Sequence, residues 1–433
     1  MTEPQATASS AAPDAPRRRP LALWFAIPLW KRILFALVLG VVVGLLWGEG
    51  AGAIKWIGDL FVRLIRMLVV PLVFVTIASG VAALGSPQRL GSIGIKTLAM
   101  YVLTTMIAVT VGLTVATLIA PGAGASFADV TPGTIAEARD PTQILLDIVP
   151  TNPIAAMANG ETLAVIFFAV LVGAGVIAAG EQGSPLGRML NSASEVMLRI
   201  VGFVMEVAPF GVFALIASVV GTSGLETFVS VFKLAICVAI GAAVQTLIVH
   251  GGVVRLGAWL PVMPFFRGVA DAIMVGFSTS SSSATLPVAI RVAERNLGIS
   301  PPVASTVLPL GATIGMDGAA MYIGMLTLFA VQAFGVVLSP ADYIVIALTI
   351  TIVAMGVAPV PSGSLFVLAA VLAQIGVTPE QTAIIVGFIL PFDRILDMTR
   401  TIPNVTADLA IATAVARWER EIDVEQYKSS DDV

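Results

Sequence analysis

The chain is poor in the residues that carry most soluble enzyme chemistry. Its 433 residues include one cysteine and one histidine, and only 12% are charged. A single cysteine excludes an intramolecular disulfide, and the single histidine, His250, argues against a histidine-based metal site or proton relay. The scarcity of charge, together with 57% hydrophobic residues and a mean hydropathy of +0.97, excludes a soluble globular protein and indicates a polytopic membrane protein.

Long apolar runs mark candidate membrane spans of the ~20 residues that a bilayer requires. They cover about residues 30–49, 62–84, 97–120, 160–180, 196–220, 227–250, 303–334 and 380–414. Residues 17–32 are rich in Lys and Arg, whereas residues 121–150 carry four acidic residues and one arginine. This asymmetry predicts a cytoplasmic N-terminus, and an even number of spans returns the C-terminus to the cytoplasm. The Ala-, Pro- and Ser-rich beginning of the chain is expected to be a disordered tail and not a cleaved signal peptide.

Two further apolar segments are interrupted too early to be simple spans. Residues 258–296 contain a serine-rich run at 278–285, and residues 341–376 contain a proline-rich run at 358–364. Flanks of roughly 10–18 residues predict re-entrant hairpins whose tips lie in protein or water. Because a hairpin followed by a helix occurs twice, we expect an inverted repeat around a midplane site. The predicted fold is all-α, with eight transmembrane helices, two re-entrant helical hairpins and an inverted-repeat transport core.

A polar stripe on the last candidate span is the strongest pointer to function. Its members, spaced mainly by three or four residues and therefore on one helical face, are Asp393, Asp397, Arg400, Thr401, Asn404 and Asp408. A charged side chain at the bilayer centre costs roughly 2.5–3.5 kcal/mol on insertion scales, so we expect the stripe to face a protein interior or a wet cavity. Two anions and one cation within two turns suit a zwitterion or a metal cation.

A glycine-rich break in the seventh span, residues 311–318, is a second candidate site. Three glycines in eight residues allow the helix to unwind. Unwinding frees carbonyl oxygens, which are hard ligands suited to Na⁺. Asp317 adds a charge and Met316 adds a thioether.

Three motifs together resemble the dicarboxylate/amino acid:cation symporters, the family of glutamate transporters. They are Ser280 to Pro287, Gly315-Met316-Asp317-Gly318, and Asp397 to Thr401 continued by Asn404 and Asp408. The likeness covers nearly the whole chain after about residue 30. It implies a homotrimer in the lipid of the bacterial inner membrane. It also implies a mobile transport domain, about residues 77–120 and 226–416, that carries substrate and cations across by an elevator motion. No nucleic acid partner and no cofactor are expected.

The resemblance also implies how the chain is divided. The expected parts are a disordered cytoplasmic N-terminal tail (1–29), scaffold helices (30–76), a transport-domain helix (77–120), an external loop with scaffold helices (121–225), a second transport-domain helix (226–257), the first hairpin (258–296), the broken seventh helix (303–336), the second hairpin (341–376), the eighth helix with the binding residues (380–416) and a cytoplasmic tail (417–433).

The resemblance assigns substrate contacts to the eighth helix and the two hairpin tips. Arg400 matches the arginine whose planar fork pairs with the substrate's side-chain carboxylate. Asp397 matches the aspartate that holds the α-ammonium, while Asn404 and the Ser282 backbone N–H match groups that hold the α-carboxylate. The remaining expected contacts are Thr401, Ser281, Val360 and Ser364.

Three cation sites are implied in the same way. The first combines Asp408 and Asn404 with carbonyls of Gly311 and Gly315; the second combines Thr313 and Met316 with second-hairpin carbonyls around 354–357; the third combines Tyr101, Thr104, Thr105 and Asp317. Na⁺ is the expected cation. A proton on one of the buried aspartates is the alternative.

The chain departs from the family pattern at several positions. Gly315 and Ala319 replace the usual Asn and Thr, which weakens the third cation site and removes a substrate contact. Ser364 replaces a usual glycine at the second tip. Ser280 stands where some prokaryotic members have an arginine, and Arg394 is a candidate for the missing positive charge.

The sequence therefore predicts a secondary active symporter that imports glutamate or aspartate with cations, and not an enzyme. A proton-coupled symporter and a C4-dicarboxylate symporter are the alternatives, although the anionic Asp397 would repel a plain dicarboxylate. An intramembrane aspartyl protease using Asp317 and Asp397 is a remote alternative, since the Gly-x-Gly-Asp pattern is absent. A channel would need a repeated ring of pore-lining residues, which the sequence does not show.

Overall fold

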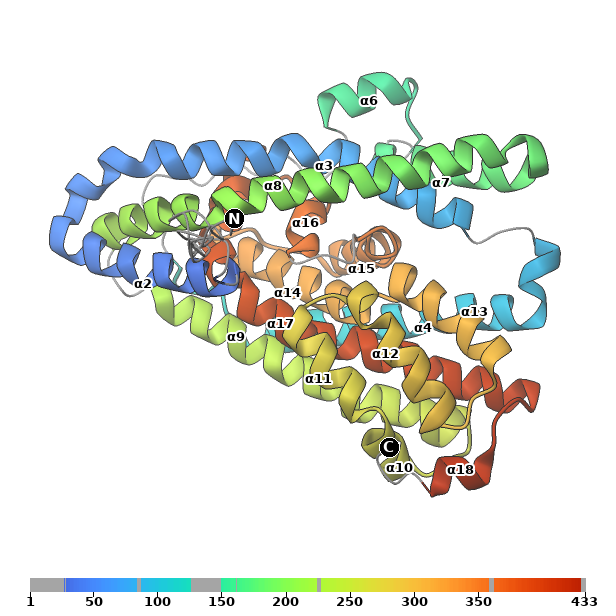
Figure 1. Cartoon of the computed structure of the whole chain (residues 1–433). Helices are drawn as coiled ribbons and strands as arrows, with labels where there is room; N and C mark the ends of the chain where they lie inside the picture. Colours follow the sequence, from blue (N-terminus) through green and yellow to red (C-terminus); the bar gives the residue numbers. More distant parts are fainter. Residues whose placement is uncertain are drawn as a thin grey trace, which may run out of the picture.

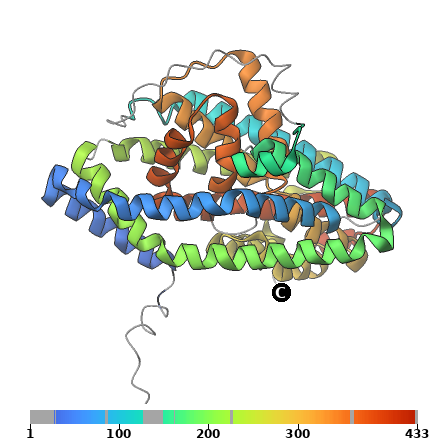
Figure 2. The ribbon, with the colours of Figure 1, turned by 90° about the horizontal axis from the view of Figure 1, so that it is seen from above.

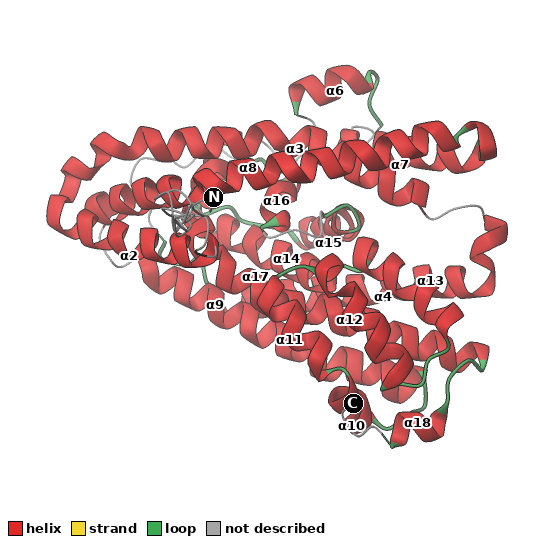
Figure 3. Ribbon diagram, viewed as in Figure 1, coloured by secondary structure: helices red, strands yellow, loops and turns green. Residues whose placement is uncertain are grey.

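A computed structural model describes residue 27 and residues 29–83, 87–125, 149–160, 162–223, 227–357 and 362–429. Within these ranges the chain is almost wholly helical, and the one β-type pairing is a bridge between Ile299 and Ile422 (Figure 3). The all-α prediction is confirmed.

The apolar runs of the first half form helices close to the expected bounds. These are α2 (Leu29–Trp47), η1 (Gly48–Ile54), α3 (Lys55–Ala83), α4 (Pro87–Ile119), α6 (Pro153–Asn159), α7 (Thr162–Ala178), η2 (Gly180–Gln182), α8 (Ser184–Ser223) and α9 (Thr227–Ala243). The helix of α9 continues through two π-helical segments, η3 (Val244–His250) and η4 (Val253–Gly257).

The second half consists of helices of 17 residues or fewer and one helix of 41 residues. They are α10 (Val262–Gly268), α11 (Ala270–Thr279), α12 (Ser282–Arg295), α13 (Pro301–Ile314), α14 (Asp317–Ala333), α15 (Pro340–Ala354), α16 (Gly363–Gln374), α17 (Pro379–Glu419) and α18 (Val424–Lys428). By length and hydropathy, four helical stretches of the described chain could cross a membrane, and a bent pair within α8 would make five. The expected number of eight stays a prediction.

The long helices are arranged in two packed groups. α8 packs against α2 and α3, and α3 packs against α7, so that these helices form an outer layer (Figures 1 and 2). Beside this layer, α14 packs on α4, and α17 packs against α9, α11, α13 and α14. The two groups touch where α16 contacts α3 and α17 contacts α8. The polar stripe of α17 is therefore enclosed by helices of the second group.

The helices break at the three places that the sequence indicates. α11 and α12 are joined by Ser280, which is left-handed at φ +54, and Ser281 then caps α12 by accepting from the Ala284 N–H at 3.2 Å. α13 ends at Ile314 and α14 begins at Asp317. Ser362, at φ +63, precedes α16. A left-handed non-glycine residue costs of order 1–3 kcal/mol and is typical of functional segments, so both tips carry local strain.

α17 is a single helix from the second hairpin to the C-terminal end of the bundle. A capping box between Thr378 and Gln381, with proline at the first helical position, fixes its start. Pro403 lies within the helix without ending it. Near its end, Glu419 accepts from Lys96 Nζ at 2.7 Å and from Ser92 Oγ at 2.6 Å. These hydrogen bonds, first the one from Lys96, lower the pKa of Glu419 and tie α17 to α4.

The segment after α17, expected as a tail, folds back onto the bundle. Tyr427 is fully buried and donates to the Pro261 carbonyl at 2.7 Å, and burial raises the pKa of its phenol. The Asp423 N–H donates to the Gly298 carbonyl at 2.8 Å. Residues 421–429 therefore brace the turn that leads from α12 into α13.

Candidate functional site

Arg400 and Asp397 form a buried ion pair at the centre of the stripe. They lie three residues apart on α17, and Arg400 Nη2 contacts Asp397 Oδ1. Arg400 is 3% exposed and Asp397 is fully buried. The other carboxylate oxygen, Oδ2, accepts the Ser362 backbone N–H at 3.0 Å, so the second hairpin tip contacts the stripe directly.

Tyr322, which the sequence analysis did not select, contacts Arg400 and Asp393 from the facing helix α14. The Arg400 guanidinium lies 5.6 Å from the centre of the Tyr322 ring, a cation–π contact. The Tyr322 hydroxyl donates to Asp393 Oδ1 at 2.8 Å. Asp393 is fully buried, and its second oxygen has no hydrogen-bond partner among the described residues. The pair and its neighbours therefore leave one carboxylate oxygen for a further donor.

The hairpin tips line the same region with hydroxyl groups. Ser280, Ser282 and Ser364 are buried, and within the described chain the hydroxyls of Ser280 and Ser364 have no partner. The first hairpin packs on α17 where Gly276 meets Val405. A buried hydroxyl without a partner is costly, so these groups are suited to bind a polar ligand. Of the other tip residues expected at the site, Ser281 caps α12, and Val360 lies outside the described residues.

Asn404 joins the stripe to the broken seventh helix. Its Oδ1 accepts the Gly318 N–H at 2.7 Å, and its Nδ2 lies 3.6 Å from the Met316 sulfur. Thr401 instead donates within its own helix, to the Asp397 carbonyl at 2.7 Å. Gly318 is required here, because a Cβ at this position would overlap the Arg400 carbonyl oxygen.

Asp408 is enclosed by the residues that the first cation site requires. A Cβ at Gly311 would overlap the Tyr101 hydroxyl and the Asp408 carboxylate, and a Cβ at Gly315 would overlap the Tyr101 ring and the same carboxylate, so these side chains rest directly on the glycine backbone. Asp408 is 5% exposed, and the Tyr101 hydroxyl lies beside its carboxylate. A buried carboxylate packed against glycine backbone fits a hard cation.

The second expected cation site is less closely assembled. Met316 is buried, whereas Thr313 is exposed and its hydroxyl donates to the Pro309 carbonyl at 3.0 Å. The second hairpin reaches this neighbourhood, since Thr76 Oγ1 lies 3.5 Å from the Gly356 carbonyl. The carbonyls of 354–357 are thus close to α3, and their role as ligands stays a prediction.

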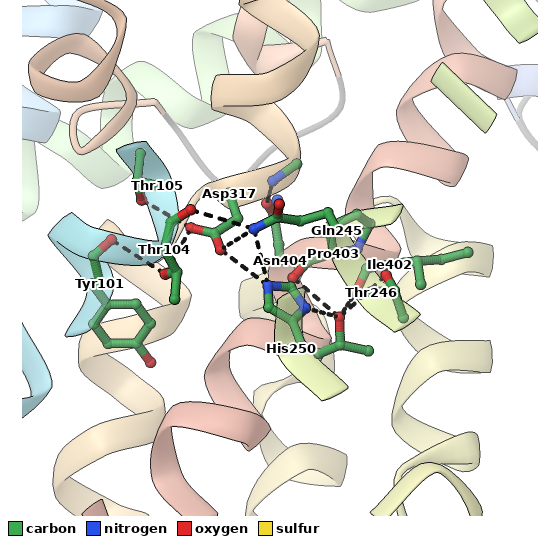
Figure 4. A network of polar contacts seen from close by, with 12 residues as sticks. Tyr101, Thr104, Thr105, Gln245, Thr246, His250, Asp317, Ile402, Pro403 and Asn404 are labelled. Atoms are coloured by element: carbon green, nitrogen blue, oxygen red, sulfur yellow. Dashed lines mark hydrogen bonds and ion pairs between the residues drawn. The ribbon is translucent and has the colours of Figure 1, made fainter. Parts of the chain in front are cut away.

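Asp317, expected in the third cation site, lies at the centre of a polar network (Figure 4). Thr104 and Thr105 of α4 donate to its Oδ1 at 3.2 and 2.8 Å. Gln245 and His250 of η3 approach its Oδ2 with their Nε2 atoms at 3.0 and 3.1 Å. Tyr101, by contrast, directs its hydroxyl to the Val307 carbonyl at 3.3 Å and has no contact with Asp317 in Figure 4.

His250 and Gln245 are the functional candidates that the sequence reasoning missed. The single histidine was an argument against a histidine relay, but it is fully buried beside Asp317. The spacing of five residues between Gln245 and His250 was the one sequence feature that could have indicated a shared partner. In the π-helical segment η3, i→i+5 hydrogen bonds bring residues five apart onto one face.

The site carries an excess of buried negative charge. Asp317, Asp393, Asp397 and Asp408 are each at most 5% exposed, whereas Arg400 is the one buried arginine of this group. An uncompensated buried charge costs several kcal/mol. The arrangement therefore favours binding of cations together with a ligand that carries both charges. No group of three His, Cys, Asp or Glu side chains suited to a metal ion occurs in the described ranges.

Comparison with known proteins gives a consistent result. A family model described as the sodium:dicarboxylate symporter family matches residues 29–418. The chain is 34% identical over 403 residues to a proton/sodium-glutamate symport protein of Bacillus subtilis (strain 168), covering 90% of this chain and 92% of that protein.

Two further relatives differ in the substrates that they are named for. A C4-dicarboxylate transport protein of Anaeromyxobacter sp. (strain K) is 34% identical, with 91% of this chain and 90% of that protein covered. A proton/glutamate-aspartate symporter of Escherichia coli (strain K12) is 35% identical, with 91% and 93% covered.

Proposed function

This chain belongs to the sodium:dicarboxylate symporter family, and we propose that it is a secondary active symporter that imports aspartate or glutamate together with Na⁺. It is a multi-pass membrane protein. The observation that carries the choice of substrate is the buried Arg400–Asp397 ion pair. One cation and one anion side by side are complementary to the side-chain carboxylate and the α-ammonium of an acidic amino acid.

In this proposal each charged group of the substrate has its own partner in the site. Arg400 pairs with the side-chain carboxylate, Asp397 accepts from the α-ammonium, and Asn404 with the first hairpin tip holds the α-carboxylate. Arg400 and Asp397 already neutralise each other, so the side-chain carboxylate and α-ammonium of the substrate can exchange partners with them without adding net buried charge. The α-carboxylate adds one negative charge, which a cation bound with the substrate offsets. The hydroxyls of Ser280 and Ser364, which lack partners in the described chain, supply further donors. Thr401, Ser281 and Val360 complete the proposed contacts.

Na⁺ binding is proposed first at Asp408. Its carboxylate, the carbonyls around Gly311 and Gly315, and the nearby Asn404 provide the hard oxygen ligands. A second Na⁺ is proposed at Thr313 and Met316 below the second hairpin. Cations here would neutralise buried carboxylates, and a transmembrane potential contributes about 2.3 kcal/mol per charge per 100 mV to their entry.

The second hairpin links cation and substrate binding. Ser362 contacts Asp397 through its backbone N–H, and the Gly356 carbonyl of the same hairpin lies 3.5 Å from Thr76 Oγ1 of α3. A cation that orders this hairpin would therefore also order the substrate site. The movement is proposed to be an elevator motion of residues 77–120 and 226–416 against the outer layer of 30–76 and 121–225. The assembly is proposed to be a homotrimer in the bacterial inner membrane, with both termini cytoplasmic.

Uptake into proteoliposomes tests the proposed function. Labelled aspartate, glutamate and succinate are offered under an inward Na⁺ gradient at equal pH, and then under an inward proton gradient without Na⁺. We expect concentrative uptake of aspartate or glutamate that requires Na⁺. Concentrative uptake under the proton gradient alone would refute sodium coupling.

Asp408→Asn tests the first cation site, because it removes the negative charge and keeps the size of the side chain. Because linkage is reciprocal, Na⁺ and aspartate must strengthen each other's binding by the same factor. The variant should therefore weaken both affinities together, measured by calorimetry across a Na⁺ series. A variant with unchanged Na⁺ dependence would remove Asp408 from the cation site.

A C4-dicarboxylate symporter is the second candidate, because one group of relatives carries that name. Asp397 separates the two candidates, since a dicarboxylate has no ammonium to meet this carboxylate. Preferential uptake of succinate in the same proteoliposomes would favour this candidate.

A further inference from the structure

Both oxygens of Asp317 are occupied by side-chain donors of the protein itself. Thr104 and Thr105 fill Oδ1 from α4, and Gln245 and His250 fill Oδ2 from η3 (Figure 4). An ionised carboxylate offers about four lone-pair sites. All five side chains are at most 1% exposed. A cation at Asp317 would have to displace donors that are buried and already in place.

The groups beside Oδ2 present hydrogen atoms, not ligand oxygens. Gln245 Nε2 lies 3.0 Å from Asp317 Oδ2 and 3.3 Å from the Thr104 carbonyl oxygen. Turning the amide would place its own oxygen against these two acceptors, so the N–H group must face them. An N–H donor repels a cation, and the side chains of Gln245 and His250 therefore offer Asp317 no oxygen to complete a Na⁺ shell.

The hydrogen bonds of His250 orient its ring toward Asp317. Thr406 Oγ1 lies 3.0 Å from the Ile402 carbonyl and donates to it, so His250 Nδ1, at 2.8 Å from the same hydroxyl, must be the donor in that contact. His250 Nε2 therefore faces Asp317 Oδ2 at 3.1 Å and Gln245 Nε2 at 3.3 Å. The imidazole ring thus fills the space beside Oδ2 that a cation would need.

The opposite side of the expected cation site lacks a ligand as well. Gly315 has no side chain, and a Cβ there would overlap Tyr101 and Asp408. The Tyr101 hydroxyl is directed to the Val307 carbonyl. Neither position supplies an oxygen to Asp317.

We propose that His250 and Gln245 take the place of a cation at Asp317, so that this transporter couples substrate to one cation fewer than the three sites of the resemblance. The inference rests on the proposed function, because it concerns the cations that accompany the substrate. His250 is thus a residue that determines coupling stoichiometry, and Asp317 is not a Na⁺ ligand. The cations that remain are those proposed at Asp408 and at Thr313 with Met316.

The dependence of substrate affinity on Na⁺ tests the proposal in the full-length protein. When n sodium ions bind with the substrate, and Na⁺ is well below saturation, the aspartate Kd falls by 10ⁿ for each tenfold rise in Na⁺. The wild type should show about a 100-fold fall per tenfold rise, corresponding to two ions. A 1000-fold fall in the wild type would overturn the proposal.

His250→Ala should open the site at Asp317 to Na⁺. With a third ion bound, the aspartate Kd of this variant should fall about 1000-fold for each tenfold rise in Na⁺, compared with about 100-fold in the wild type. His250→Gln, which retains an N–H donor, should keep the wild-type slope. Thr246→Ala is the matched control, because Thr246 lies on the same π-helical segment and its hydroxyl lies 3.5 Å from the Thr406 hydroxyl, not against Asp317.

The outcomes separate this proposal from the proposed function. Loss of all aspartate binding in the wild type would refute the function itself. A wild-type Kd that ignores Na⁺ would refute sodium coupling, and the slope gained by His250→Ala would still decide the role of His250. A His250→Ala slope equal to the wild-type slope would overturn the proposal. If His250→Ala does not fold, a wild-type slope of two ions that His250→Gln preserves would support it, and a steeper His250→Gln slope would refute it.

Discussion

Replacing Arg400 with Gln should remove most of the affinity for acidic substrates. The guanidinium is 3% exposed, paired with Asp397 and placed over the Tyr322 ring, so it is held in one geometry before substrate binds. In the proposed complex it is the partner of the side-chain carboxylate. The variant leaves that carboxylate, as well as the buried Asp393 and Asp397, without the Arg400 guanidinium.

The expected magnitude follows from the burial of the pair. Truncating one partner of a buried, hydrogen-bonded charge pair costs about 2–5 kcal/mol. At about 1.4 kcal/mol per factor of ten, the aspartate Kd should rise by about 30-fold to about 4000-fold. A neutral amino acid does not use the guanidinium, so its affinity should fall less, and its ability to compete relative to aspartate should increase.

Calorimetry on purified protein at fixed Na⁺ measures this change. Arg32→Gln is the matched control, because Arg32 is also buried and ion-paired, with Glu206, but lies on α2 of the outer layer. Arg400→Lys separates charge from geometry, since lysine keeps the charge and loses the planar fork. An aspartate Kd within threefold of wild type in a folded Arg400→Gln protein, or a larger loss in Arg32→Gln, would refute the assignment.

Three other substitutions probe the support of the site. Gly318→Ala should cost about 1–3 kcal/mol of stability through overlap with the Arg400 carbonyl, and it should abolish aspartate binding. Thermal unfolding measures the loss of stability and calorimetry measures binding. Normal aspartate binding would contradict the close packing of Gly318 on the Arg400 carbonyl. Tyr322→Phe removes the hydrogen bond to Asp393 and should cost about 1.5–3 kcal/mol of stability, whereas a neutral effect would show that this bond is unimportant. Glu419→Gln tests the ion pair with Lys96. Because the pKa of Glu419 is lowered from 4.5 in the folded protein, the stability that the ionised carboxylate contributes should be constant above about pH 5 and should disappear as the pH falls through the folded-state pKa. A difference in stability between variant and wild type that persists in acid would exclude the ion pair.

The sequence predicted the helices and the stripe because both follow from periodicity. Apolar runs gave the long helices, and the spacing from Asp393 to Asp408 placed the charges on one buried face of α17. The break at Gly315 was visible as well, since three nearby glycines weaken a helix. The structure of the proline-rich run was harder to predict from the sequence, and its residues 358–361 lie outside the described chain.

The Asp317 network could not be predicted because it depends on a departure from α-helical geometry. An expected period of 3.6 residues places Gln245 and His250 on different faces, whereas the π-helical segment η3 directs both to Asp317. The role of Tyr322 was hidden for another reason. It lies in a helix that is apolar and buried on nearly every side, so no amphipathic pattern marks its face.

The central claim is that Asp397 and Arg400 together select an acidic amino acid, and competition between aspartate and succinate tests it most directly. Inhibition constants are measured for both compounds against labelled aspartate, in the wild type and in Asp397→Asn. Since only aspartate offers an ammonium group to the buried Asp397 carboxylate, the wild type should bind aspartate about 30-fold or more tightly than succinate. The variant should lose most of that preference. Succinate that competes as well as aspartate in the wild type would contradict the account.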